Sequence, residues 1–320
     1  MKPNIKNKSA RLRRFYPLLA LTLLAAPFLQ GLTISESSAA RTLHTPNKAD
    51  RAMVNTSSVH QTYQPDGIKV LAEGFHSKIT KPFVAVVRDV ETYAALRKLD
   101  ENLPKLDADF FKENAVLAAF LGERNTGGFS VEITPSPVDI NVLEKKPGKG
   151  VMVPQMITSP FKMVALQGVS NAAVRLNLFV DETWRQAMTS YRVTSGRFRM
   201  SGGIAGTSEG FGLQGPMAVM REGNLASFSF RIVGSETRKR RLLMEYATGV
   251  IDGENKIQIN RMSADSLVDS PNSGLAGTAT FSEEGRKLTL SLMSRPSLIV
   301  DGYSGQGTIE AELRAPATKP

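Results

Sequence analysis

The chain has 320 residues, no cysteine, three histidines and a formal net charge of +10. Without cysteine it can form neither disulfides nor thiolate metal sites. Six Lys or Arg and one Glu lie in residues 1–40, so only half of the net charge belongs to the rest of the chain, which is too little for a nucleic-acid-binding footprint.

Residues 1–40 have the features of an export signal. Basic side chains between Lys2 and Arg14 precede an apolar run from Phe15 to about Leu32, and small residues end the segment before Ala40. This order predicts a signal peptide that is cleaved after Ala40, and hence a periplasmic or extracellular protein with no stable membrane span after cleavage. The alternative is an uncleaved anchor, since about 20 apolar residues can just cross a bilayer.

The polar stretch 41–65 has no apolar period, which predicts a flexible spacer. Residues 66–167 then mix strand and helix patterns. Phe83–Val87 predicts a short strand, and Asp89 after it can cap a helix. The apolar residues of that helix recur at helical spacing: Tyr93, Leu96 and Leu99.

Further strand patterns follow the helix. Ala115–Leu121 is continuously apolar, which predicts a strand buried on both faces. Phe129–Ile133 alternates apolar and polar residues, which predicts a half-buried antiparallel strand, and the alternation resumes at 138–142. One helical region against a mainly antiparallel sheet predicts an α+β domain for residues 66–167.

From Tyr191 onward the hydrophobic period is two almost everywhere, in roughly eight runs separated by turn residues. This pattern predicts that residues 191–320 form an all-β antiparallel sandwich or barrel. Residues 168–190 between the two parts are predicted to be a linker with a short helix around Trp184. We expect the Trp184 side chain to pack at the junction between the two domains.

The run from Gly122 to Ile133 reads GERNTGGFSVEI and follows an apolar strand pattern. Pro147-Gly148, Val153-Pro154-Gln155 and Thr158–Phe161 follow in order. By these motifs, residues 66–167 resemble the C-terminal domain of the PrcB family of secreted proteins. The resemblance implies a non-catalytic subunit that associates with and stabilises an exported serine protease, and it implies no catalytic residues. It does not extend to residues 190–320.

Catalytic motifs in the sequence lack the partners that they need. Gly206–Gly210 matches G-x-S-x-G around Ser208, but no histidine follows residue 76 to accept the serine proton. A G-x-G-x-x-G pattern at 210–215 lies in a period-two region, so we expect a kinked or bulged strand there. With no cysteine and three histidines, a transition-metal site is not expected either. We therefore predict no enzymatic activity, no cofactor and no metal.

The loop between two predicted core strands is the candidate binding site, because loops held by a rigid frame often carry function. Its six residues are Glu123, Arg124, Asn125, Thr126, Gly127 and Gly128. The charged and polar side chains would contact a partner, and the glycines would leave the backbone accessible. We then expect alanine at Arg124 and Thr126 to leave stability nearly unchanged. A plain hairpin turn is an equally good interpretation.

We therefore expect an exported, non-catalytic binding protein whose partner is another exported protein, such as a serine protease that it stabilises or regulates. The alternative is that the β-domain holds an apolar small molecule or an envelope glycan. An eight-stranded barrel with an open interior would favour this alternative. A filled core together with an exposed apolar patch would favour protein binding.

Overall fold

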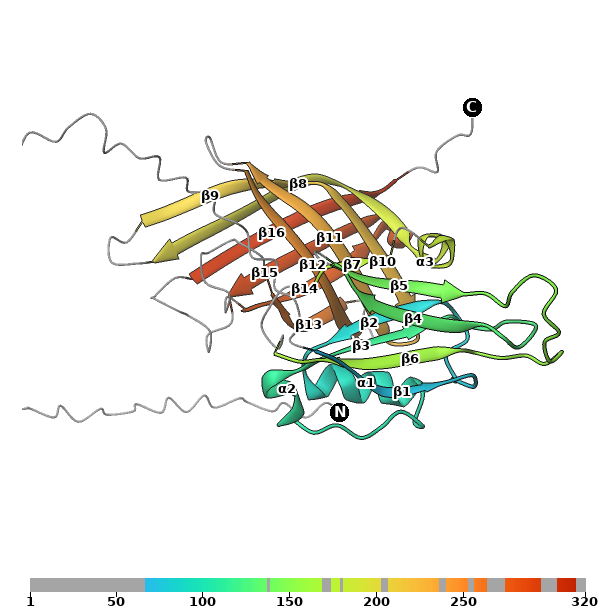
Figure 1. The fold of residues 1–320 in the computed structure, drawn as a ribbon. Coiled ribbons are helices and arrows are strands. Elements are labelled where there is room, and N and C mark those ends of the chain that lie inside the picture. The colour runs from blue at the N-terminus through green and yellow to red at the C-terminus, as the bar shows by residue number, and fades with distance from the viewer. Residues whose placement is uncertain are drawn as a thin grey trace, which may run out of the picture. The chain divides into compact units, whose positions relative to one another are not determined.

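A computed structural model describes residues 67–136, 139–168, 174–178, 181–202, 207–235, 240–252, 256–263, 274–294 and 304–314 (Figure 1). The predicted export signal (1–40) and spacer (41–65) lie outside the described residues, so both stay predictions. Val138, which the sequence placed in an alternating strand, also lies outside them.

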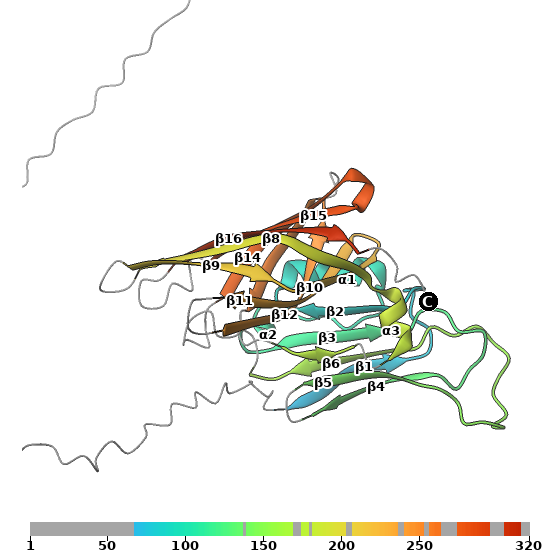
Figure 2. The same cartoon turned by 90° about the horizontal axis from the view of Figure 1, so that it is seen from above.

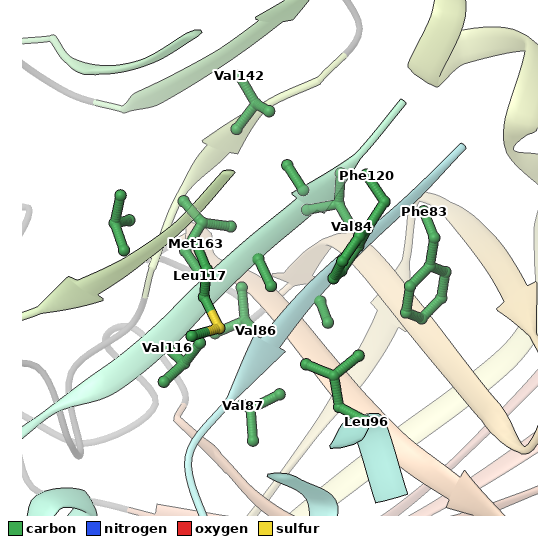
Figure 3. Close-up of a cluster of buried hydrophobic side chains, with 14 of the residues drawn as sticks. Phe83, Val84, Val86, Val87, Leu96, Val116, Leu117, Phe120, Val142 and Met163 are labelled. Carbon is green, nitrogen blue, oxygen red and sulfur yellow. The ribbon is translucent and has the colours of Figure 1, made fainter. Parts of the chain in front are cut away.

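The first part of the described chain is built on a four-stranded antiparallel sheet. Its order is β1 (Ile68–Gly74), β6 (Phe161–Leu166), β3 (Ala115–Phe120) and β2 (Phe83–Val87). Every residue of β2 and β3 is buried, which confirms the prediction that β3 is covered on both faces. Figure 3 shows two of the covering side chains, Leu96 and Val142, on opposite sides of these strands.

Helix α1 (Val90–Leu99) begins at the predicted cap. The Asp89 carboxylate accepts a hydrogen bond from the backbone N–H of Thr92 at 2.8 Å, which satisfies one of the free donors of the first turn. Tyr93 and Leu96 are buried against the sheet, as their spacing predicts.

Two shorter helices, α2 (Phe110–Glu113) and α3 (Glu182–Ala187), accompany α1. Helix α3 lies in the segment predicted to be a linker with a short helix. Its Trp184 is fully buried in the same hydrophobic cluster as the four-stranded sheet, so it acts as a packing anchor. Among the described residues, no helix is long and apolar enough to cross a membrane.

A small second sheet contains β4 (Ser130–Pro135), β5 (Ile140–Lys145) and β7 (Leu176–Asn177). Strands β4 and β5 are antiparallel, whereas β5 and β7 are parallel. Val131 and Ile133 are buried between less buried neighbours, which confirms the half-buried strand predicted from alternation.

The later part of the chain forms an eight-stranded antiparallel barrel, which decides between the two predicted all-β architectures. Apart from the two strands on either side of Gly215, each strand pairs with the next along the chain, and the last pairs back with the first. The nine strands occupy eight places in the wall. Two of them lie end to end beside the same neighbouring strand, because Gly215 interrupts what would otherwise be one continuous strand. This break confirms the irregular strand expected at 210–215. The strands are β8 (Thr189–Gly202), β9 (Thr207–Gln214), β10 (Pro216–Glu222), β11 (Leu225–Ser235), β12 (Arg240–Ile251), β13 (Lys256–Ser263), β14 (Gly274–Ser282), β15 (Lys287–Ser294) and β16 (Ser304–Leu313).

The barrel interior is apolar and packed where side chains are described. Successive residues of a strand face opposite sides of the wall, so Met217 and Val219 point inward while Met220 packs outside. The inward-facing residues form a single buried cluster: Tyr191, Met217, Val219, Ala226, Phe228, Ala247, Ile257, Ile259, Ala279, Leu288, Leu290, Leu292, Ile309 and Ala311. At one end the Tyr191 hydroxyl donates to the carbonyl of Gly285, in the 3₁₀ turn between β14 and β15, at 2.8 Å.

The outer wall of the barrel covers the free edge of strand β2. The hydroxyl of Tyr246 donates to the carbonyl of Val84 at 3.0 Å, and the N–H of Val86 donates to Oγ1 of Thr248 at 3.0 Å. Figure 2 shows β12, which carries Tyr246 and Thr248, next to β2. An uncovered edge strand can pair with another chain, and these contacts prevent that. The division into domains at 66–167, 168–190 and 191–320 stays a prediction.

We expect Tyr246→Phe to lower the free energy of unfolding by about 1–2 kcal/mol, because it leaves the buried carbonyl of Val84 without its donor. Burial raises the pKa of the Tyr246 hydroxyl well above its ordinary value, so this group keeps its proton at neutral pH. Thr280→Val, on an exposed position of β14, is the control and should change stability by less than about 0.5 kcal/mol. Urea unfolding of both variants measures the difference; equal stabilities would contradict the prediction.

Candidate functional site

The candidate loop, Glu123–Gly128, joins β3 to β4 and is held in place by backbone hydrogen bonds. Arg124 and Thr158 exchange two of them, with N···O distances of 2.7 and 2.9 Å. The N–H of Gly127 donates to the carbonyl of Pro154 at 2.9 Å. The loop is therefore fixed to the segment that connects β5 with β6, and it has a defined conformation before any partner arrives.

The two glycines of the loop serve packing within the chain. A Cβ atom on Gly127 would lie 3.2 Å from Cδ of Pro154. Gly128 has a φ of +85°, and a Cβ atom there would lie 2.8 Å from a methyl carbon of Val153. Gly127 is buried and its N–H already donates to Pro154, so this N–H is not available to a partner, whereas Gly128 is exposed.

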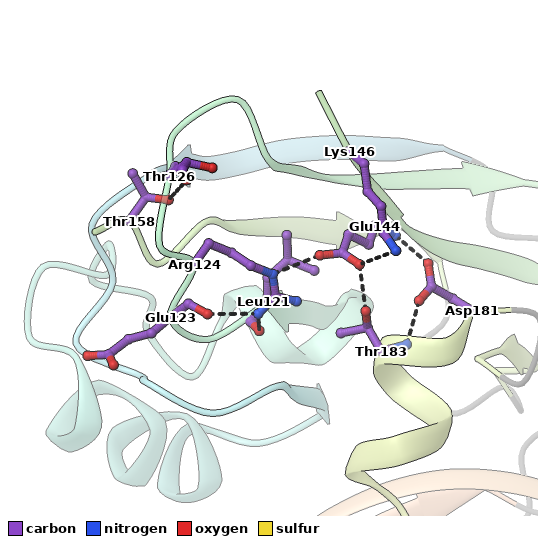
Figure 4. A network of polar contacts seen from close by, with 9 residues as sticks. All are labelled: Leu121, Glu123, Arg124, Thr126, Glu144, Lys146, Thr158, Asp181 and Thr183. Carbon is purple, nitrogen blue, oxygen red and sulfur yellow. Dashed lines mark hydrogen bonds and ion pairs between the residues drawn. The ribbon is translucent and has the colours of Figure 1, made fainter. Parts of the chain in front are cut away.

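Arg124 points toward Glu144 and braces the loop (Figure 4). Its Nε donates to Oε1 of Glu144 on β5 at 2.7 Å, and its Nη1 donates to the carbonyls of Leu121 and Glu123. The Glu144 side chain is only 3% exposed, and its other oxygen accepts from the hydroxyl of Thr183 on α3 at 2.6 Å. Arg124 is thus a part-buried link from the loop to β5 and, through Glu144, to α3. The expectation that Arg124 presents an unpaired charge is wrong, and we expect its removal to lower the stability of the fold.

A signal for this ion pair was present in the sequence. Ile140 and Val142 of β5 face the core, and Glu144 is the next residue on that face. A carboxylate at a core-facing position must be neutralised or hydrogen-bonded, because burying an isolated charge is very unfavourable. Its partner Arg124 is 20 residues away, however, and nothing local in the sequence pairs the two.

The remaining polar residues of the loop differ in their exposure to solvent. Glu123 and Asn125 are exposed, whereas Thr126 is half-buried. The carbonyl of Thr126 accepts a hydrogen bond from the hydroxyl of Thr158 at 3.1 Å. Glu123 and Asn125 are therefore the side chains of this loop that are most open to solvent, and the binding role of the loop residues stays a prediction.

Exposed apolar side chains lie next to the candidate loop. We call them the apolar rim: Phe75, Val151, Met152, Met156 and Ile157. Four of the five come from the segment between β5 and β6 that is bonded to the loop, and Met152 is 97% exposed. Phe75 belongs to the adjoining segment after β1, since its carbonyl accepts the N–H of Ser159 at 2.7 Å. Exposed apolar patches on soluble proteins often mark interaction sites.

The described part of the G-x-S-x-G motif does not have the local structure that a catalytic serine needs. Ser208 lies within strand β9, where it pairs with Ser201, and the nucleophile elbow needs a turn from strand to helix. Within the described ranges, no three His, Asp or Glu side chains are grouped as metal ligands.

Comparison with known families bears on the segment that contains the loop. Residues 115–167 match the model of the PrcB C-terminal family. The PrcB C-terminal segment runs from the start of β3 to just after β6, and it includes the candidate loop, Glu144 and four residues of the apolar rim. The resemblance predicted from sequence is thereby confirmed for this segment, while residues 66–114 lie outside the match. Comparison with curated proteins gives no match.

Proposed function

We propose that the chain is an exported, non-catalytic protein that binds another exported protein through the apolar rim. The observation that carries this proposal is the exposure of five large apolar side chains on and beside the PrcB C-terminal segment. In this proposal residues 66–167 act as one α+β binding domain, and Glu123 and Asn125 contribute polar contacts at the border of the interface.

The energetics of the apolar rim suit a protein partner. Full burial of one such side chain contributes about 1.5–3 kcal/mol. Association itself costs about 4–15 kcal/mol in lost translational and rotational freedom and in ordering. Several rim residues must therefore be buried together, which a protein surface can do and a small ligand cannot. The backbone of the segment that carries four of the rim residues is already bonded to the candidate loop, which lowers the cost of ordering that backbone on binding.

We propose a serine protease as the partner class. The support is the family match, because the resemblance implies a subunit that associates with and stabilises such an enzyme. The alternative of a ligand inside the barrel has less support, since the described inward-facing residues already form one packed apolar cluster.

Site-specific photo-crosslinking tests the proposal. A photoreactive phenylalanine analogue at position 152 should crosslink the exported protein to one partner, which mass spectrometry then identifies. The matched control is position 293, because Met293 is also an exposed methionine but lies on the barrel strand β15. Equal crosslinking from both positions, or none from position 152, would refute docking at the rim.

A further inference from the structure

A cavity of about 640 Å³ opens beside Arg124, on the side of the candidate loop that faces α3. Both apolar and charged side chains line it. The residues that matter here are Pro82, Arg124, Phe129, Glu144, Lys146 and Thr183. All except Pro82 and Thr183 belong to the PrcB C-terminal segment.

The charged groups of this cavity differ in whether their hydrogen-bonding atoms already have partners. Both oxygens of Glu144 already accept hydrogen bonds, one from Arg124 and one from Thr183. Nε of Arg124 donates to Glu144, and its Nη1 donates to two backbone carbonyls of the loop region. Its Nη2 donates to no group among the described residues. Lys146 Nζ lies 3.8 Å from Glu144, beyond hydrogen-bonding distance, on a side chain that is 68% exposed.

The cavity therefore contains two cations, Arg124 and Lys146, that can still donate hydrogen bonds. Its one carboxylate, Glu144, already accepts a hydrogen bond at each oxygen, so the three groups together carry one net positive charge. This balance suits a singly charged anion, because a dianion would leave excess negative charge next to Glu144. A guanidinium and an ammonium are also the groups that form the stronger, charge-assisted hydrogen bonds with carboxylates. Pro82 and Phe129 provide apolar surface for the carbon atoms that carry such a group.

We infer that this cavity binds a carboxylate of an extended peptide. In this arrangement the carboxylate of the peptide accepts hydrogen bonds from Nη2 of Arg124 and from Nζ of Lys146. The exposed Lys146 side chain moves toward the bound carboxylate. The inference that the carboxylate belongs to a peptide rests on the proposed function, because the cavity adjoins the loop that lies next to the apolar rim. The preference for a carboxylate rests on the cavity alone.

Nuclear magnetic resonance titration of the exported protein tests this inference without knowledge of the partner. The probes are acetyl-leucine, which has a terminal carboxylate, acetyl-glutamate α-amide, which has a side-chain carboxylate, and acetyl-leucinamide, which has none. We expect the Nε–H resonance of Arg124 to shift and saturate with at least one carboxylate probe, and the amide to bind at least tenfold more weakly. The carboxylate that binds more tightly identifies the source.

A matched pair of variants separates binding from structure. Lys146→Met should weaken the carboxylate probe at least fivefold. Lys145→Met should not, because Lys145 pairs with Glu132 at 3.2 Å and does not line the cavity. Equal binding of acid and amide, or an unchanged affinity in Lys146→Met, would overturn the inference. A failed crosslink from position 152 alongside a positive titration would refute the docking proposal and leave the carboxylate site standing.

Discussion

Arg124→Ala is expected to lower the free energy of unfolding by about 3 kcal/mol, at the lower end of what breaking a buried ion pair costs. The substitution leaves the carboxylate of Glu144 almost fully buried with only the hydroxyl of Thr183 as a close partner. Lys146 can move toward the carboxylate and offset part of the loss. Because Trp184 is the single tryptophan and lies next to Thr183, its fluorescence during urea unfolding reports directly on this region.

Lys145→Ala is the matched control for this experiment. Lys145 also pairs with an acid across β4 and β5, but its partner Glu132 is one-third exposed, so the pair contributes at most about 1 kcal/mol. Replacing both Arg124 and Glu144 with apolar residues should recover part of the lost stability, because no buried charge then remains unpaired. A loss below 1 kcal/mol for Arg124→Ala would show that the loop does not depend on this brace.

The double substitution Met152→Asp and Ile157→Asp is expected to weaken binding of the crosslinked partner by at least a hundredfold. Each change removes an apolar contact of about 1.5–3 kcal/mol and brings a charge into a surface that becomes dry on binding. Since 1.4 kcal/mol corresponds to a tenfold change in the dissociation constant, two sites together exceed a hundredfold. Biolayer interferometry with the purified partner measures the constant.

The melting temperature of this double variant should stay close to that of the unmodified protein, because both side chains are exposed. Met293→Asp, on the barrel, is the control and should bind the partner normally. Binding of the double variant within threefold of the original would place the interface away from the apolar rim.

The candidate site shows where sequence reasoning succeeded and where it failed. The motif around Gly127 correctly selected the segment, as the PrcB C-terminal match over 115–167 confirms. Within that segment the side chains were assigned the wrong exposure. Arg124 was expected to offer its charge to a partner but is held by Glu144, and the nearly full exposure of Met152 was not predicted.

The reason is that burial in a loop depends on contacts distant in the chain. Residues 151–157 follow a turn, and no period tells which of their side chains face water. Arg124 is drawn inward because β5, reached 20 residues later, brings Glu144 to the same side of the sheet. Such a pairing needs the register of two strands and the position of a helix, neither of which is encoded locally.

Local patterns alone determined several of the secondary-structure elements in the described part of the chain. The continuous apolar run of β3, the alternation in β4 and the cap of α1 at Asp89 each follow from periodicity or from the hydrogen-bonding capacity of a single side chain. Only the tertiary structure decided between sandwich and barrel, because β8 and β16, at opposite ends of the β-region, must pair to close the wall. The same holds for the covered edge of β2, since Tyr246 reaches Val84 across 162 residues. Contacts between residues so far apart in the sequence leave no periodic trace in it, and they close the barrel and cover the edge of β2.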